Sequence, residues 1–212
     1  MRKIKLVLFA LALPFIFKAQ SFGGSIEFKY YTIKDTTTNV YLVKDKNVKL
    51  DQYGKRSTNV EGSFVFDLGN NTIKFVNPKR KVWGEHKSEV PPVIKGVCVT
   101  SKTSNSKKIL GVKCTEYIVK NTDENTIISY WMAAGKYDFF IPMVKLWNRK
   151  DKQSVYFNQI KDLAPGSLPM LSEEKQVSDG KLITRLEVIK LEKGDLEASK
   201  VAIPEDYKKF EE

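Results

Sequence analysis

Apolar and polar residues alternate along much of the chain from about residue 25, which is the pattern of strands with one buried face. In the segment 25–31, for example, Ile26, Phe28 and Tyr30 share one face and polar or aromatic residues occupy the other. Further short runs are separated by polar or glycine-containing turns, and they cover residues 40–43, 48–53, 63–67, 72–77 and 80–84. The first half of the chain is therefore predicted to be a meander of short antiparallel strands.

A longer apolar strand is predicted at residues 107–120, which read KKILGVKCTEYIVK. Val112 and Cys114 share one face, whereas Tyr117 falls on the other. Two explanations fit this pattern. Either the strand is covered on both sides, or its alternation changes phase near Thr115.

The second half of the chain interrupts its strands once. Residues 126–133 are apolar on both faces, so this predicted strand needs a cover on its second side. Between residues 135 and 171 the apolar residues follow helical spacing, which predicts one or two short helices that form this cover. Strands return at residues 171–177 and 181–191, around a Ser-Asp-Gly turn.

The fold class predicted from these runs is mainly β. We expect a single antiparallel, strongly curved sheet of about eleven strands, an incomplete β-barrel, with short helices after the ninth strand. The chain beyond residue 20 is long enough to bury one core, so residues 21–212 are predicted to form a single domain.

Residues 1–20 have the charge order of a secretory signal peptide: Arg2, Lys3 and Lys5 precede an apolar run that ends at Phe17. That run of about a dozen residues is shorter than the roughly 20 residues that a membrane-spanning helix needs. A retained membrane anchor is the alternative. No cysteine follows the run to accept a lipid, so we expect a protein of the periplasm or a secreted protein.

Export makes a disulfide between the two cysteines chemically reasonable. If residues 93–101 and 107–120 form a hairpin centred near Ser106, Cys98 lies opposite Cys114. Closing a loop of about 15 residues would then stabilise the fold by roughly 3 kcal/mol. The alternative is two unpaired, buried thiols, because a disulfide requires specific geometry.

The net charge of +11 does not indicate nucleic-acid binding. The first 20 residues hold four basic and no acidic side chains, which leaves +7 for the remainder. Only five of the 36 basic residues are arginines. Specific recognition of phosphates and bases usually relies on the bidentate hydrogen bonds of the arginine guanidinium. We therefore expect no nucleic-acid partner, and interpret the dispersed lysines as a solubilising surface with weak attraction to anionic membranes.

Several segments resemble an uncharacterised family of exported Gram-negative envelope proteins, the domain of unknown function 4412. They are the opening GSIEFKYY, the central KKILGVKCTEYIVK with the following Trp131, SLPML and the closing IPEDYKKF. That family is similar in fold to periplasmic lipoprotein carriers and receptors, whose incomplete barrel and short helices enclose an apolar cavity. The resemblance implies a protein that binds acyl chains or another apolar ligand. Fold analogy alone does not assign binding residues.

The candidate pocket residues come from the predicted helices and from the strands beneath them. Aromatic side chains and flexible methionines suit a pocket for variable apolar chains. The alternative for each is simple core packing. The predicted ligand-binding residues are Trp83, Tyr130, Met132, Phe139, Phe140, Met143, Trp147 and Tyr156.

No pattern in the sequence indicates an enzyme. The single histidine, His86, lies among charged residues and is expected at the surface, and no nucleophile elbow or metal-ligand spacing occurs. We expect no metal and no cofactor. The predicted function is a monomeric envelope protein that binds a lipid or another hydrophobic small molecule, with a membrane surface or a lipoprotein as further partners. The alternatives are a structural or partner-binding protein without a ligand and, less favoured, a hydrolase.

Overall fold

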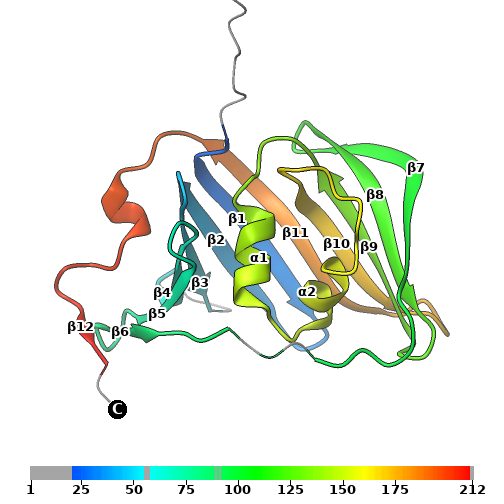
Figure 1. The fold of residues 1–212 in the computed structure, drawn as a ribbon, viewed down its shortest axis with the longest axis horizontal. Helices are drawn as coiled ribbons and strands as arrows, with labels where there is room; N and C mark the ends of the chain where they lie inside the picture. The colour runs from blue at the N-terminus through cyan, green and yellow to red at the C-terminus, as the bar shows by residue number, and fades with distance from the viewer. Residues whose placement is uncertain (1–20, 55–57, 89, 91, 211–212) are drawn as a thin grey trace, which may run out of the picture.

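A curved sheet of twelve strands makes up most of the chain (Figure 1). The structure is a computed structural model that describes residues 21–54, 58–88, 90 and 92–210. The predicted signal peptide, residues 1–20, lies outside the described residues. Within them, the predicted fold class is confirmed: the sheet is a single one, it does not close into a barrel, and short helices follow the ninth strand.

The elements lie close to the predicted runs. The first six strands are β1 (Gly24–Thr32), β2 (Thr36–Lys44), β3 (Asn47–Tyr53), β4 (Val60–Asp67), β5 (Thr72–Asn77) and β6 (Val82–Glu85). The next elements are β7 (Val99–Ile109), β8 (Val112–Asn121), β9 (Thr126–Ala133), α1 (Phe140–Trp147) and α2 (Lys152–Phe157). The chain ends with β10 (Leu168–Gln176), β11 (Leu182–Lys193), the 3-10 helix η1 (Ala198–Val201) and β12 (Lys208–Lys209).

Strand β1 lies in the middle of the sheet and joins the two halves of the chain. The strand order is β12-β6-β5-β4-β3-β2-β1-β11-β10-β9-β8-β7. Most neighbours in the sheet are consecutive in the sequence, and they pair antiparallel. The pairing of β1 with β11 instead links strands far apart in the sequence, and the short pairing of β12 with β6 is parallel.

The β7–β8 hairpin turns at a different place from the predicted one. Leu110 and Gly111 form a two-residue turn, both with positive φ (48° and 77°), which is the type I′ geometry that suits twisted strands. The predicted linker at residues 102–106 instead belongs to β7. A register shift between Lys102 and Ser106 lies opposite Glu116. Residues 93–98, predicted as part of a strand, precede β7 and are not strand.

The burial pattern of β8 changes phase beside this register shift. Cys114 is buried before the shift, and Tyr117 and Val119 are buried after it, so the alternation changes phase at the intervening residues. Of the two explanations drawn from the sequence, the phase change near Thr115 is confirmed. Val112 packs against the core, and Ile118, which alternates with its buried neighbours, faces the other side of the sheet.

The structure contradicts the predicted disulfide. Cys114 pairs across the hairpin with Lys107. Cys98 instead lies beside Asn121, and the Asn121 Nδ2 atom is 3.7 Å from the Cys98 Sγ atom. Cys114 and Asn121 are seven residues apart on one strand, a span of about 23 Å at the usual rise per residue. Both thiols are free. The alternative of two unpaired thiols therefore describes the chain, with Cys114 buried and Cys98 half-buried.

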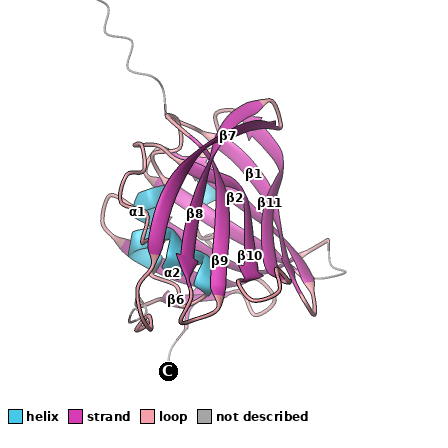
Figure 2. Ribbon diagram, turned by 90° about the vertical axis from the view of Figure 1, so that its right-hand side faces the viewer, coloured by secondary structure: helices cyan, strands magenta, loops and turns pink. Residues whose placement is uncertain are grey.

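The two helices lie on the concave side of the sheet, which curls around them (Figure 2). On α1, Phe140, Met143 and Trp147 are buried at the i, i+3, i+7 spacing of one helix face. The helix ends at Asn148, which adopts the left-handed conformation. Among the described residues, no helix is long and apolar enough to cross a membrane. The core therefore lies between the concave face of the sheet and α1 with α2.

Candidate functional site

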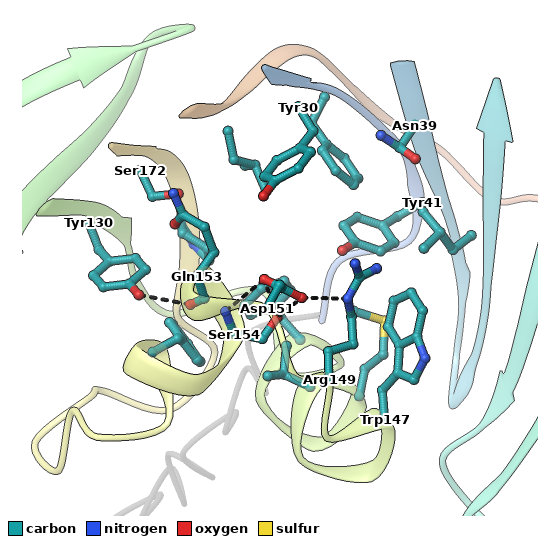
Figure 3. Close-up of a pocket in the computed structure, with 18 of the residues that line it drawn as sticks. Tyr30, Asn39, Tyr41, Tyr130, Trp147, Arg149, Asp151, Gln153, Ser154 and Ser172 are labelled. Carbon is teal, nitrogen blue, oxygen red and sulfur yellow. Dashed lines mark hydrogen bonds and ion pairs between the residues drawn. The ribbon is translucent and has the colours of Figure 1, made fainter. Parts of the chain in front are cut away.

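A cavity of about 230 Å³ lies between the concave face of the sheet and the two helices (Figure 3). Strands from both halves of the sheet contribute to it, because β1 lies next to β11. Most of its lining is apolar or aromatic: Phe28, Tyr30, Tyr41, Leu50, Tyr130, Phe140, Met143, Val144, Trp147, Phe157, Pro169 and Leu186. The polar part of the lining is Thr37, Asn39, Gln52, Arg149, Asp151, Gln153, Ser154 and Ser172.

Four of the eight predicted pocket residues line this cavity: Tyr130, Phe140, Met143 and Trp147. Phe140, Met143 and Trp147 lie on α1, and Tyr130 lies on β9, which faces the helices. Met143 is fully buried and Trp147 packs its ring against Phe66 at a centroid distance of 5.2 Å. The walls of the cavity are thus held by packing in the core rather than by flexible loops.

The other four predicted residues lie outside the cavity lining. Met132 and Phe139 are core residues, and Phe139 packs against Phe140 and Tyr41. Trp83 lies on β6, where the ammonium groups of two lysines cover its ring. Tyr156 is fully buried, but its hydroxyl serves a structural contact. For these four residues the structure shows packing or structural contacts in place of a cavity wall.

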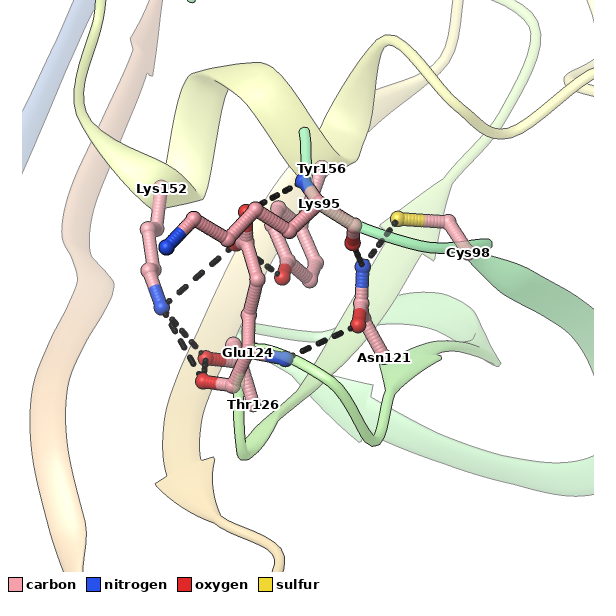
Figure 4. A network of polar contacts seen from close by, with 7 residues as sticks. All are labelled: Lys95, Cys98, Asn121, Glu124, Thr126, Lys152 and Tyr156. Carbon is pink, nitrogen blue, oxygen red and sulfur yellow. Dashed lines mark hydrogen bonds and ion pairs between the residues drawn. The ribbon is translucent and has the colours of Figure 1, made fainter. Parts of the chain in front are cut away.

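Tyr156 belongs to a polar network that ties α2 to the turn between β8 and β9 (Figure 4). Its hydroxyl donates to Glu124 Oε2 at 2.7 Å, and the backbone N–H of Lys95 donates to Glu124 Oε1 at 2.9 Å. Lys152 Nζ donates to Thr126 Oγ1 at 2.6 Å. The Tyr156 hydrogen bond, followed by that of Lys95, lowers the pKa of Glu124 below its ordinary value. Glu124 is therefore a carboxylate at neutral pH that anchors the helix.

A charged pair marks the partly exposed mouth of the cavity. Arg149 Nε donates to Asp151 Oδ2 at 2.6 Å, and the Arg149 guanidinium lies over the Trp147 ring, 4.7 Å from its centroid. Asp151 is also the N-cap of α2, where it accepts hydrogen bonds from the backbone N–H and hydroxyl of Ser154. The Arg149 and Asp151 side chains are 40% and 27% exposed.

The opposite side of the cavity holds a chain of hydrogen bonds. Tyr130 Oη donates to the carbonyl of Gln153 at 2.8 Å, and Gln153 Nε2 donates to Thr184 Oγ1 at 3.0 Å. Thr184 Oγ1 in turn donates to Glu174 Oε2, which fixes the orientation of the Gln153 amide. Gln153 Oε1 is buried and has no hydrogen-bond partner. A buried acceptor without a partner therefore lies on this side of the cavity.

The tyrosines of the cavity remain protonated at neutral pH. Burial raises the pKa of Tyr130 well above its ordinary value. Burial also raises the pKa of Tyr41, and the nearby Arg149 charge opposes this shift without cancelling it. A protonated phenol offers a hydrogen-bond donor rather than a nucleophile. At neutral pH the Tyr130 and Tyr41 hydroxyls therefore act as hydrogen-bond donors.

The pocket prediction from the sequence named only four of the twenty residues that line the cavity. Tyr30 was placed on the buried face with Ile26 and Phe28, so its alternation was a usable signal. Leu50 carried the same signal, because it alternates with Lys49 and Asp51. Tyr41 and Arg149 had no such signal, because their approach to the helices depends on how the sheet curves. The sequence alone does not specify that curvature.

His86 differs from its predicted surface position. Its ring packs edge-on against Phe64 at a centroid distance of 5.2 Å, and its Nε2 atom is buried without a hydrogen-bond partner. Phe64 in turn packs against Trp147, so His86 lies behind the cavity wall. Within the described ranges, no group of three or more His, Cys, Asp or Glu side chains is arranged to hold a metal ion.

Two solved structures are similar to this chain at low sequence identity. PNGF-II shares 11% identity over 84% of this chain, with a TM-score of 0.41, and this chain spans 29% of its length. A LolA superfamily protein from Nitrosomonas europaea shares 9% identity over 88% of this chain and 91% of its own, with a TM-score of 0.36.

The family comparison covers most of the chain. No curated protein matches it. The family described as "Domain of unknown function (DUF4412)" matches residues 22–207, from just before β1 to just before β12. This match includes both halves of the sheet and the two helices, and it confirms the resemblance noted in the sequence. The chain therefore belongs to the DUF4412 family.

Proposed function

We propose that this chain is an exported envelope protein that binds an apolar ligand, a lipid or an acyl chain, in the concave face of its sheet. The observation that carries the proposal is the cavity between the sheet and α1, with its lining of aromatic and aliphatic side chains. Binding sites for apolar ligands are concave, mainly apolar and contain a few polar groups that orient the ligand. This cavity has all three features. We further propose that the protein is monomeric and non-catalytic.

The size of the cavity limits how much ligand it encloses. A cavity of about 150 Å³ in another protein binds benzene, so one of 230 Å³ encloses about nine non-hydrogen atoms by proportion. That is one short acyl chain or the end of a longer one. A lipid with several chains would enter only if α1 or α2 moved away from the sheet.

Export is the second part of the proposal. Its support is the order of charges and apolar residues in residues 1–20, with Arg2, Lys3 and Lys5 before the apolar run. Fractionation of cells that produce the full chain tests it. We expect the protein in the periplasm or the medium, shortened by about 20 residues, the usual length of a signal peptide. Full-length protein in the cytoplasm would contradict export.

Displacement of a hydrophobic fluorescent probe tests ligand binding. We expect the purified protein to bind the probe and fatty acids to displace it. Leu186 lines the cavity between Tyr30 and Ser172, so Leu186→Trp should fill the space and weaken probe binding about tenfold or more. The matched control is Ile127→Trp, which adds the same ring on the outward face of β9.

Native mass spectrometry of protein purified from its own envelope provides the independent test. A bound lipid or fatty acid would support the proposal. Protein that is always empty, together with probe binding that Leu186→Trp and Ile127→Trp change equally, would contradict it. That result would favour the alternative of a structural or partner-binding envelope protein.

A further inference from the structure

The mouth of the cavity holds a cation whose terminal nitrogens are free. Arg149 uses Nε for the ion pair with Asp151 and its flat face for Trp147. Its two terminal nitrogens form no hydrogen bond or ion pair with any other part of the chain that the structure describes. Figure 3 shows them directed away from Asp151 and towards the hydroxyl end of Tyr41. A guanidinium in this position is open to a ligand.

The orientation of this guanidinium is set before any ligand arrives. Asp151 holds the Nε edge, and the Trp147 ring holds the plane at 4.7 Å. The two oxygens of Asp151 also accept the hydrogen bonds of Ser154, so this carboxylate is committed to the cap of α2. Preorganisation of this kind reduces the entropy lost when the ligand binds.

A second donor lies beside the free nitrogens. The Tyr41 side chain is 8% exposed, and its hydroxyl forms no hydrogen bond within the described residues. Because burial raises the pKa of Tyr41, this hydroxyl keeps its proton and serves as a donor. On the opposite side of the cavity, the unpartnered atom is the acceptor Gln153 Oε1. Donors thus gather at the Arg149 end and an acceptor lies at the other.

We propose that the ligand is an acidic amphiphile with one apolar tail, bound with its carboxylate at Arg149 and Tyr41 and its tail against Phe140 and Met143. This inference rests on the proposed function and narrows its ligand class. The two oxygens of a carboxylate match the fork of a guanidinium, which a hydroxyl or an ester does not. The acceptor Gln153 Oε1 would repel a carboxylate and so fixes the direction of binding.

The proposal distinguishes two sources of an acyl chain. A free fatty acid carries the carboxylate that Arg149 requires. An acyl chain attached to a lipoprotein or a glycerolipid through an amide or ester does not. The volume of the cavity, which encloses about nine non-hydrogen atoms by the proportion above, suits an acid of medium length such as octanoate.

The test compares octanoate with 1-octanol, which has the same tail and no charge, by competition against the fluorescent probe at neutral pH. We expect the wild-type protein to bind octanoate about tenfold more tightly than 1-octanol, the contribution of a hydrogen bond to a charged group. Arg149→Gln should remove this preference, because it should weaken octanoate binding about tenfold more than 1-octanol binding. Arg149→Lys should restore part of it.

Arg80→Gln is the matched control. Arg80 also lies over an aromatic ring, that of Phe210 at 5.5 Å, but it is outside the cavity. Arg80→Gln should leave the affinities for octanoate and for 1-octanol unchanged. If Arg149→Gln does not fold, as judged by circular dichroism, Tyr41→Phe replaces it, because this variant removes one hydroxyl and should weaken octanoate selectively by a few-fold.

Three outcomes overturn the proposal in different ways. Equal binding of octanoate and 1-octanol to the wild type would refute the carboxylate site and leave the proposed function intact. Equal weakening of both ligands by Arg149→Gln would show that Arg149 only supports the fold. Failure of both ligands to displace the probe would refute the proposed function itself.

Discussion

Tyr156 shows how a residue can be correctly predicted as buried and still have a different role. Its helical spacing placed it on the inner face of the predicted helices, and the structure confirms that it is buried. Its ring does not line the cavity, because its hydroxyl reaches Glu124 at the end of the sheet. The identity of that partner depends on tertiary contacts between segments that are 32 residues apart.

Tyr156→Phe should destabilise the protein by about 1 to 2 kcal/mol at neutral pH, because it removes a partly buried hydrogen bond to a carboxylate. The hydrogen bond lowers the pKa of Glu124 from its ordinary 4.5, so its stabilisation is present above that value and is lost as the pH falls through the lowered pKa. The difference in unfolding free energy between wild type and variant should therefore shrink as the pH falls below 4.5 and through the lowered pKa of Glu124. Urea denaturation at several pH values measures it.

Tyr137→Phe is the control for this prediction. Tyr137 is also buried, and its hydroxyl forms no hydrogen bond with another described residue. Loss of the Tyr137 hydroxyl should change the free energy of unfolding little, and this small change should be the same at neutral and acid pH. A gap for Tyr156→Phe that stays constant down to pH 3, or one that grows on acidification, would contradict the assigned role of Glu124.

Residue-level prediction of the cavity succeeded for apolar residues on α1 and β9, such as Met143 and Tyr130, and failed for Arg149. Apolar residues at regular spacing face a core, which is a local property of the sequence. A single arginine after a helix looks like any exposed arginine. Its assignment to the cavity requires the positions of Trp147 and Asp151, which only the folded chain supplies.

At the level of elements, the β7–β8 hairpin shows that hydrophobic alternation predicts strands better than it predicts the position of the turn between them. The alternation predicted both strands, but it placed the turn at Ser106 instead of Leu110 and Gly111. A leucine is an unusual residue in a type I′ turn, where asparagine and glycine dominate. Because Leu110 is not a usual turn residue, the sequence pattern did not indicate a turn there. The register that results places Cys98 and Cys114 far apart.

Leu110→Asn should stabilise the protein by about 1 kcal/mol, because asparagine tolerates the left-handed conformation better than leucine does. Leu110 has a φ of 48° and is 51% exposed, so its side chain contributes little packing. Chemical denaturation measures the change. Leu110→Ala is the control. An equal gain in both variants would show that the benefit comes from removing an exposed apolar side chain and not from the turn.

At the level of the whole molecule, β1 determines whether the cavity exists. It pairs with β2 on one side and with β11 on the other, so the two halves of the sheet meet there. Gly24 begins this strand with a φ of 134°, and a Cβ at this position would lie 2.0 Å from the carbonyl oxygen of Glu192. The close approach of β11 therefore requires a glycine here.

Gly24→Ala should lower the free energy of unfolding by at least about 2 kcal/mol, through backbone strain and separation of β1 from β11. It should also weaken probe binding, since Tyr30 and Leu186 would move apart. Gly23→Ala is the neighbouring control, because its Cβ would lie an ordinary 3.4 Å from Gly194 O. Equal stability of the two variants in urea denaturation would argue against β1 as the joint of the sheet.

The sequence by itself determined most of the strands, the antiparallel meander, the short helices after the ninth strand and the family resemblance. These features depend on local periodicity and on turn residues, which are read within a few positions. Tertiary structure alone decided the register of β7 on β8, the free cysteines, the pairing of β1 with β11 and the polar mouth at Arg149. These depend on contacts between distant segments, because the alternation of a strand specifies which residues share a face but not which strand they meet.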